Sequence, residues 1–456
     1  MTENEIRKEK ILTLLDSRKY AELTEAMGEI IPVDLAEIFE DIPSEYRMKL
    51  FRLLPKDVAS ELFIHIDSDS QESIIGAFSD REVSEMLREL YLDDTVDVIE
   101  EMPAHIVKKI LKNSSPEDRS VINELLGYPR DSAGTIMTTE YVRLVEYMTV
   151  EAAILHLRRV AIDKETIYTC YVTDRERRLI GIVTAKDLLI SEPETKISDI
   201  MERSVIYAYT GDEREEVARK IEKYGFLALP IVDNENRLVG IVTVDDAIEV
   251  LGEETEEDIS KMAAITPSEE PYLKSSAFSI FKARIPWLLL LMISATLSST
   301  ILASFEARLA SVLVLFVPML MDTGGNSGNQ ASVTLVRGLS LGEIKLSDFL
   351  LVWFKEIRVG ILCAVSLGAV AFGKIMLVDR FIMNNSEVTL SVGIVVAVTL
   401  ALTVIISKLV GSSLPILASR VGLDPAVMAS PFITTAVDAI SLIVYFLIAS
   451  PFFSVG

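Results

Sequence analysis

The chain has 456 residues, half of them hydrophobic, and a formal net charge of −24. Residues 1–280 hold 59 acidic and 33 basic residues, a net charge of −26, whereas residues 281–456 hold nine acidic and eleven basic ones. Because residues 1–280 are so acidic, they repel nucleic acid. Their favoured small partners are cations, especially divalent ones. With only Cys170 and Cys363, the sequence predicts neither a disulfide framework nor a cysteine metal site.

The N-terminal region contains short apolar-periodic segments that Pro or Asp residues separate. The chain starts MTENEIRKEK, which has no apolar core, so we expect no signal peptide. Segments such as IPVDLAEIFEDIP and SEYRMKLFRLLP are typical of short helices stacked into a superhelix. We therefore expect an acidic, all-α regulatory N domain over residues 1–130. Helical spacing places Asp93 and Asp97 on one face, which by itself is better explained as a solvated acidic surface than as a binding site.

An internal repeat occupies residues 131–250. YVTDRERRLIGIVTAKDLL begins at 171 and recurs as IVDNENRLVGIVTVDDAIEV at 231. Each copy predicts a strand, a polar turn, a second strand and a helix that starts with Thr and Asp. Gly181 and Gly240 occupy equivalent places, and an Ile-Met pair precedes each copy at 136–137 and 200–201. The pattern predicts two α/β units of the same fold.

The repeat resembles a tandem pair of CBS domains. In that family a Thr or Ser, followed by an Asp at the helix start, contacts the ribose of an adenine nucleotide. The resemblance implies a nucleotide site, with ATP as its ligand, at Thr184, Lys186 and Asp187. Thr243 and Asp246 are the equivalents in the second copy. The threonines are explained equally well as helix N-caps.

An acidic connecting helix is predicted over residues 251–284, between the repeat and the apolar half. Carboxylates crowd its beginning and the residues just before it, and Lys261 is the only nearby cation. Like charges four positions apart repel, so this helix loses stability unless something neutralises it. A divalent cation held between domains would do so, and an ordinary solubilising linker helix is the competing explanation.

The second half, residues 285–456, predicts a helical membrane domain with five spans. They cover residues 287–305, 311–335, 359–378, 388–407 and 425–450. An odd number of spans places the two ends of the chain on opposite sides. With a cytoplasmic N-terminus and an external C-terminus, most basic residues fall inside, which agrees with the positive-inside rule. They are Lys282, Arg284, Arg337, Lys345, Lys355, Arg358, Lys408 and Arg420, against Arg308, Lys374 and Arg380 outside.

Two polar features inside the predicted membrane spans require a functional explanation. Asp438 is the only charged residue from Pro425 to Gly456, and a carboxylate at a bilayer centre costs about 2.5–3.5 kcal/mol. It therefore needs a partner, a water path or a metal. The second span contains the polar run MDTGGNSGNQ at 321–330. Such a run is tolerated at membrane depth only where it is buried in protein or lines water.

The GGNSGNQ run resembles the GGNxGNQ signature of the MgtE family of magnesium channels. The family's layout is a helical N domain, a CBS pair, an acidic connecting helix and five membrane helices, which matches the whole chain. The resemblance implies a homodimeric Mg²⁺ channel in the lipid bilayer of the cell membrane, with its pore on the two-fold axis between the second and fifth spans. Asp438 would capture the ion, aided by Asn326, Gly325, Gly328, Asn329 and Thr434.

The resemblance also implies that intracellular Mg²⁺ closes the pore by bridging acidic residues of the soluble domains. The matching positions are Asp93, Asp97, Glu213, Glu215, Asp246, Glu254, Glu257 and Asp258, with Asp424 at the cytoplasmic end of the fifth span. Without the ion, charge repulsion would separate these domains and open the pore. We therefore expect Mg²⁺ as both cargo and regulator, and no nucleic-acid partner.

Competing functions make different demands on the sequence. We expect no enzyme: an intramembrane metalloprotease needs His ligands in its spans, but His65, His105 and His156 all precede them. An anion channel would need an electropositive filter. A proton-coupled or broader-specificity Mg²⁺/Co²⁺ secondary transporter stays open, because an intramembrane Asp can also carry a proton. A nucleotide sensor alone leaves Asp438 and the GGNSGNQ run unexplained.

Overall fold

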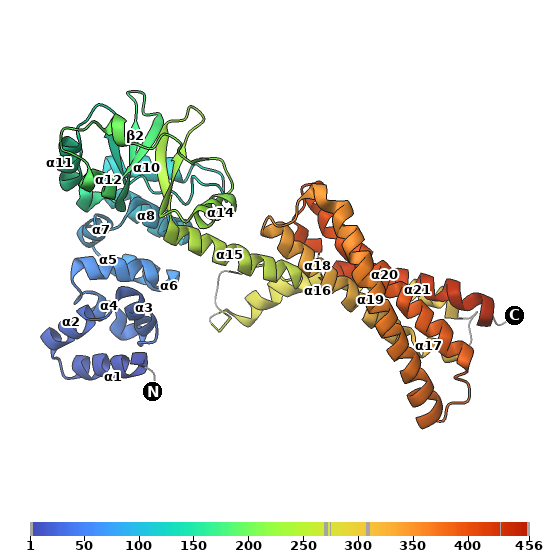
Figure 1. Ribbon diagram of the computed structural model, residues 1–456. Helices are drawn as coiled ribbons and strands as arrows, with labels where there is room; N and C mark the ends of the chain where they lie inside the picture. The colour runs from blue at the N-terminus through green and yellow to red at the C-terminus, as the bar shows by residue number, and fades with distance from the viewer. Residues whose placement is uncertain (1–2, 269–271, 274, 307–310, 429, 454–456) are drawn as a thin grey trace. The chain divides into compact units, whose positions relative to one another are not determined.

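The computed structural model describes residues 3–268, 272–273, 275–306, 311–428 and 430–453 (Figure 1). The chain forms two compact units, Met1–Gly252 and Glu253–Gly456. The first unit combines short helices with two small sheets, and the second consists of helices. Helix α15 (Val244–Met262) begins in the first unit and ends in the second.

Short helices build the first part of unit 1, and their apolar faces meet in one core. The rings of Phe39, Phe51 and Phe63 follow one another through this core, with centroids 6.3 Å apart in both pairs. The helices are α1 (Glu3–Asp16), α2 (Tyr20–Gly28), α3 (Pro32–Glu40), α4 (Ser44–Phe51), α5 (Lys56–His65), α6 (Ser68–Ala77), α7 (Asp80–Leu87), α8 (Leu92–Glu101), α9 (Ala104–Asn113) and α10 (Pro116–Leu125).

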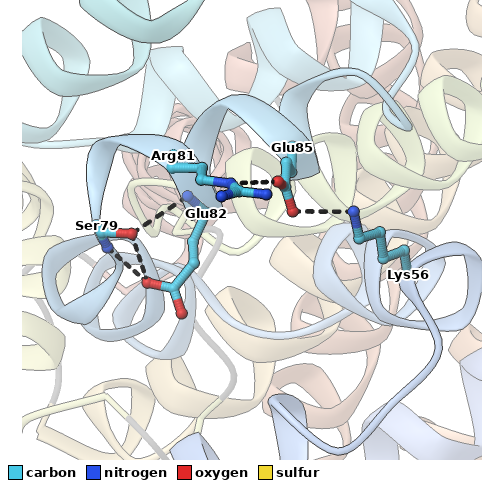
Figure 2. Close-up of polar contacts among 5 residues, drawn as sticks. All are labelled: Lys56, Ser79, Arg81, Glu82 and Glu85. Carbon is cyan, nitrogen blue, oxygen red and sulfur yellow. Dashed lines mark hydrogen bonds and ion pairs between the residues drawn. The ribbon is translucent and has the colours of Figure 1, made fainter.

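Polar contacts set the start of α7 and its position beside α5 (Figure 2). The Glu82 carboxylate accepts a hydrogen bond from the Ser79 backbone N–H at 2.7 Å, and Ser79 Oγ accepts one from the Glu82 N–H at 3.3 Å. This capping box supplies partners to two N–H groups at the start of the helix, which the helix itself cannot pair. Glu85 accepts hydrogen bonds from Arg81 at 2.8 Å and from Lys56 of α5 at 2.9 Å. These exposed ion pairs orient the two helices more than they stabilise them.

The repeat forms two three-stranded sheets of the same topology. In each sheet the first two strands are parallel and the last two antiparallel. The first sheet contains β1 (Tyr141–Val145), β2 (Thr166–Thr173) and β3 (Leu179–Thr184), and the second contains β4 (Ala208–Tyr209), β5 (Ala228–Val232) and β6 (Leu238–Thr243). The accompanying helices are α11 (Val150–Val160), η1 (Ala161–Asp163), α12 (Ala185–Ile190), α13 (Ile197–Ile200) and α14 (Arg214–Tyr224).

The two copies exchange their leading segments, which the sequence did not predict. Thr138, which precedes the first copy, bridges Ile241 on β6 of the second, and Glu202, which precedes the second, bridges Ile182 on β3 of the first. Gly181 and Gly240 permit this, since a Cβ on either would lie within 2.8 Å of the sulfur of a crossing Met. The repeated glycines thus mark the contacts that join the copies.

Helices make up unit 2 beyond α15. They are α16 (Ala277–Glu306), α17 (Ser311–Val314), α18 (Val317–Ser340), η2 (Leu346–Asp348), α19 (Phe349–Lys374), the π-helix η3 (Ile375–Ile382), α20 (Leu390–Arg420), η4 (Pro425–Met428) and α21 (Ser430–Phe453). Four segments of the described residues are long and apolar enough to span a membrane: Ala277–Ser304, Leu346–Ile382, Leu390–Arg420 and Pro425–Phe453. The predicted combination of helical N domain, CBS pair and helical membrane region is confirmed.

The remaining expected span, 311–335, corresponds mainly to α18. This helix has 24 residues, but its polar run lowers its hydropathy, and it packs along α20 and α21 (Figure 1). Several span boundaries also differ from the prediction. Helix α16 already includes Lys282 and Arg284, and α20 continues past 407, so that Lys408 is buried within the helix. Hydropathy locates an apolar stretch, whereas a helix continues wherever polar side chains find partners or reach the surface.

Glycines bring α18 into backbone contact with its neighbours. A Cβ on Gly411 of α20 would collide with the Gly328 carbonyl of α18. A Cβ on Gly328 would lie 3.0 Å from Ile433 of α21 and 3.1 Å from the Ser407 carbonyl of α20. The helices approach so closely because these positions carry no side chain, as in other membrane bundles.

We expect Gly411→Ala to destabilise the bundle. The added methyl group must push α18 away from α20, and overpacking of this kind costs about 1–3 kcal/mol. The melting temperature of the detergent-solubilised protein should fall by several degrees. Gly373→Ala is the matched control, because nothing lies within 4 Å of its Cβ position on α19. Equal melting temperatures for the two variants would contradict the close packing of α18.

Candidate cation sites

Asp438 lies where α18 and α21 meet. Gly325 of α18 faces Thr434, whose Cγ2 lies 3.1 Å from the glycine's Cβ position, and Gly324 faces Ser441, whose Oγ lies 2.9 Å from it. Thr434 precedes Asp438 by one helical turn and Ser441 follows it by one. The small residues of the polar run therefore allow α21 to bring its only carboxylate against α18.

Buried oxygen atoms without hydrogen-bond partners lie on α18, α20 and α21. Within the described residues, one carboxylate oxygen of Asp438 and the amide oxygen of Asn329 are buried and unpaired. So are the hydroxyls of Ser327, Ser332, Thr403 and Ser441. Unpaired buried acceptors are costly and rare, so each calls for a partner such as water or an ion. Oxygen donors of this kind suit hard cations such as Mg²⁺ and their hydration water.

Two other acids of the helical unit are neutralised by lysines. Glu356 of α19 lies 4.0 Å from the buried Lys408 ammonium of α20, and Asp379 of η3 accepts hydrogen bonds from Lys374 at 2.8 and 2.9 Å. The charge of Asp438, by contrast, is opposed by another acid, Asp322 of α18. Asp438 is thus the carboxylate best placed to accept a mobile cation.

The other predicted pore residues of α18 differ in burial. Gly325 and Gly328 pack against α21, and Asn329 is partly buried beside them. Asn326 is exposed, as is Asp322 one turn before it. Asp322 was not among the predicted pore residues, although its place at the start of the polar run could have suggested a role.

A second acidic cluster lies within unit 1, around α8. Burial and the charges of Asp94 and Asp246 raise the pKa of Asp93 well above its usual range. Burial and Asp246 also raise the pKa of Asp94, to about 6. Asp97 lies at the exposed edge of the cluster, where the surrounding protein and the charges of Asp94 and Asp246 raise its pKa as well. Three of the predicted regulatory residues, Asp93, Asp97 and Asp246, are therefore close together.

Further members of this cluster were not predicted. Glu140 and Glu165 precede β1 and β2, and burial raises the pKa of each to about 7. Each has one buried carboxylate oxygen without a hydrogen-bond partner among the described residues. Their burial depends on how the strands meet α8, which no local sequence pattern reveals. Across the described ranges, no three acidic, His or Cys side chains are close enough to hold a single ion directly.

Glu213 and Glu215 stand apart from the α8 cluster. Glu213 is exposed, and Glu215 is paired with Arg219 on the same helix, 2.5 Å away. The structure therefore groups these two predicted residues with α14 and its basic side chains.

A lysine joins two predicted regulatory carboxylates in unit 2. Lys261 Nζ lies 2.5 Å from Glu257 Oε1 and 2.6 Å from Asp424 Oδ2. Burial disfavours the Lys261 ammonium, but these two carboxylates outweigh it and raise its pKa. Nearby, Ser340 donates a hydrogen bond to Asp258 at 3.0 Å, and Met262 packs with Val336 and Ala426. The end of α15 is thus attached to α18 and to the segment before α21, and Glu257 and Asp424 already share a cation.

The predicted nucleotide residues form a helix cap. Thr184 Oγ1 and Asp187 Oδ2 are 2.5 Å apart, and each accepts a hydrogen bond from the other's backbone N–H. In the second copy, Asp246 Oδ2 accepts hydrogen bonds from the Thr243 hydroxyl at 2.5 Å and from the Thr243 N–H at 3.4 Å. Lys186 is exposed. The N-cap interpretation is thus correct for Thr184, and it leaves these side chains at a helix N-terminus, where anions are favoured.

Comparison with known proteins covers the same regions. Residues 317–448 match a family model described as a divalent cation transporter, MgtE, and residues 30–131 match the MgtE intracellular N domain. CBS domain models match residues 133–193 and 197–253. The chain is 37% identical to the magnesium transporter MgtE of Thermus thermophilus over 94% of both chains. It is 33% identical to that of Bacillus subtilis over 97% of this chain and 96% of the relative.

Solved structures of soluble parts are also similar. A crystal structure of the cytosolic domain of the Mg²⁺ channel MgtE in complex with ATP matches with a TM-score of 0.51 and 37% identity, covering 53% of this chain and 99% of that one. The soluble part of a magnesium transporter matches with a TM-score of 0.52 and 33% identity, covering 55% and 99%. Family models, full-length relatives and the helical and CBS regions agree, and the chain belongs to the MgtE family of divalent cation transporters.

Proposed function

We propose that this multi-pass membrane protein is a Mg²⁺-selective channel for Mg²⁺ uptake, and that intracellular Mg²⁺ closes it. The observation that carries the proposal is the Asp438 carboxylate, with a buried unpaired oxygen, at the contact between α21 and the polar run of α18. The full-length relatives named as magnesium transporters support the choice of ion. The N-terminus would be cytoplasmic and the C-terminus external, as the distribution of basic residues favours.

The chemistry of Mg²⁺ suits this arrangement. The ion demands octahedral oxygen coordination and loses its water slowly. A homodimer with its pore on the two-fold axis would present two Asp438 carboxylates, and the ion could be held through its water. Asn326, Asn329 and Thr434 would supply further oxygen atoms, while Gly325 and Gly328 would keep α21 close.

Closure would depend on the acidic cluster of unit 1. Asp93, Asp94, Asp97 and Asp246 lie close enough for their charges to repel, and Mg²⁺ shared among them would remove that repulsion. To shift a closed population from 1:99 to 99:1 requires about 5.5 kcal/mol of differential binding, which several weak sites can supply together. Glu213, Glu215, Glu254, Glu257, Asp258 and Asp424 would contribute to the same response, Glu257 and Asp424 in competition with Lys261.

ATP is the ligand we propose for the CBS pair, at Thr184, Lys186 and Asp187. The matching cytosolic domain solved with ATP supports this assignment. The competing function is proton-coupled or broader-specificity Mg²⁺/Co²⁺ secondary transport. Single-channel currents distinguish the two, because a coupled transporter gives flux that follows the pH gradient and no unitary currents.

Asp438→Asn should abolish Mg²⁺ uptake while leaving the protein folded, because the amide removes the charge that holds the ion. Uptake into proteoliposomes measures this, and gel filtration and the melting temperature report the folded state. Glu387→Gln, an exposed acid in the loop before α20, is the control and should transport normally. Normal uptake by Asp438→Asn would refute the pore assignment.

Neutralising Glu254, Glu257 and Asp258 together should leave channels open at millimolar internal Mg²⁺, because closure loses carboxylates at the end of α15. Inside-out patch recordings with stepped Mg²⁺ measure the open probability. Lys261→Met should have a different effect: Glu257 and Asp424 then repel unless Mg²⁺ binds, so closure should become more dependent on Mg²⁺. Closure identical to wild type in both variants would rule out a regulatory role for this end of α15.

The stability of the soluble part should decrease as the pH rises, and Mg²⁺ should restore it. The pKa values of Asp94, Glu140 and Glu165, about 6 to 7, lie above those of the unfolded chain. The folded state therefore binds more protons between about pH 4 and 7, and its stability declines as the pH rises through that range. Mg²⁺ should raise the melting temperature more at about pH 8 than at about pH 5.5, because the carboxylates are then charged.

Asp94→Asn tests the cause of that pH dependence. Without Mg²⁺ at high pH, it should raise the melting temperature by roughly 3 °C, the shift expected for about 1 kcal/mol in a domain of this size. It should also reduce the response to Mg²⁺. Glu61→Gln removes an exposed charge from α5 and should change neither quantity. A lower melting temperature for Asp94→Asn, or an undiminished Mg²⁺ response, would contradict the role of the cluster.

A further inference from the structure

One face of α18 is polar and exposed along two turns of the helix. Asp322, Asn326 and Gln330 follow one another at intervals of four residues, and all three are exposed. In a membrane-embedded bundle a carboxylate and two amides cannot face lipid without a large cost. This face must meet water or another protein surface.

Asp322 lies near Asp438 at the contact of α18 and α21, two residues before Gly324, which packs against Val437 as well as Ser441. The two helices run antiparallel, since Gly328 faces Ile433, Gly325 faces Thr434 and Gly324 faces Ser441. Asp322 precedes Gly324 by two residues, and Asp438 precedes Ser441 by three. The two charges are near enough to repel each other. The two carboxylates are therefore neighbours at this contact, with Asp322 nearer the start of α18.

A buried hydroxyl at the same helix contact points independently to a polar occupant. Ser441 is 1% exposed, its Oγ has no hydrogen-bond partner among the described residues, and it packs against Gly324. Asp438 also keeps one buried oxygen unpaired. A hydrated cation beside them would supply water protons to these acceptors and positive charge to both acids.

We propose that Asp322 is a second cation-binding residue of the permeation path, which holds a hydrated divalent cation beside Asp438, toward the start of α18. This assignment rests on the proposed function, in which α18 and α21 line the path. Two neighbouring sites of modest affinity allow ions to enter and leave by mutual repulsion, as conduction requires. With the N-terminus inside, Asp322 lies on the external side of Asp438 and meets the incoming ion first.

Two other acids of the helical unit have a lysine beside them. Asp379 is bound by Lys374, and Glu356 lies beside Lys408. Asp322 and Asp438 repel each other, so the charge of Asp322 adds to the demand for a cation. A carboxylate kept only for packing would gain from a basic neighbour, whereas an ion-binding carboxylate must stay available for the mobile ion.

Mg²⁺ uptake by the full-length protein in proteoliposomes tests the proposal. Asp322→Asn should raise the external Mg²⁺ concentration for half-maximal uptake about tenfold, with uptake at saturating Mg²⁺ retained. Asp322→Glu should restore the wild-type value. Hexaamminecobalt(III), a cation of similar size to hydrated Mg²⁺ with ligands that do not exchange, should inhibit Asp322→Asn about tenfold more weakly than wild type. Glu387→Gln serves as the control for the loss of one acid.

The outcomes separate this proposal from the proposed function. If Asp438→Asn abolishes uptake but Asp322→Asn keeps wild-type concentration dependence and inhibition, Asp322 does not bind the ion and only this inference fails. If Asp322→Asn abolishes uptake and Asp322→Glu does not restore it, the residue is structural, and the inference fails as well. If Asp438→Asn transports normally, the proposed path itself is wrong.

Discussion

The backbone contact of α18 with α20 and α21 is the constraint on which the helical unit depends. Because Gly328, Gly324 and Gly411 carry no side chains, three helices approach more closely than larger residues would allow. Ser327, Thr403 and Ser441 are buried there, and their hydroxyls have no hydrogen-bond partner within the described part of the chain. Apolar residues there would pack at lower cost. These unpaired oxygen atoms therefore lower the stability of the bundle. They are useful only if water or a cation reaches them.

In the soluble unit, by contrast, acidic side chains around α8 are buried beside other acidic side chains. Burial and mutual repulsion raise the pKa values around α8, so protons and metal ions compete for the same carboxylates. Protonation relieves the repulsion at low pH, and a divalent cation relieves it at neutral pH. A sensor built in this way responds most strongly to Mg²⁺ where most of these carboxylates are ionised. Its response to Mg²⁺ is necessarily linked to pH.

The sequence was sufficient where local pattern determines structure. The helical periodicity of residues 1–130, the two α/β copies and the exceptional positions of Asp438 and the GGNSGNQ run could all be predicted. The exchange of leading segments between CBS copies could not, because it depends on pairings between strands of different copies. Glu140 and Glu165 were missed for a related reason: only their tertiary burial distinguishes them from the many other acids. Lys261 was recognised as a nearby cation, but its partner Asp424 is distant in sequence.

The two ends of α15 are neutralised by different means. At its beginning, Asp246 lies among acids of α8, which have no fixed cation at their centre in the part of the chain described. At its end, Glu257 and Asp424 share the Lys261 ammonium. Lys261 is part of the chain, so this cation is present whatever the Mg²⁺ concentration. The fixed cation holds the end of the helix to the segment before α21 at any ion concentration. A mobile cation meets no such competitor at the beginning of the helix, whereas at its end it must compete with Lys261. Gly252 lies between these ends, at the boundary of the two units, with open space around it. Glycine inside a helix costs about 1 kcal/mol relative to alanine, so α15 is weakest where a response to Mg²⁺ would have to pass.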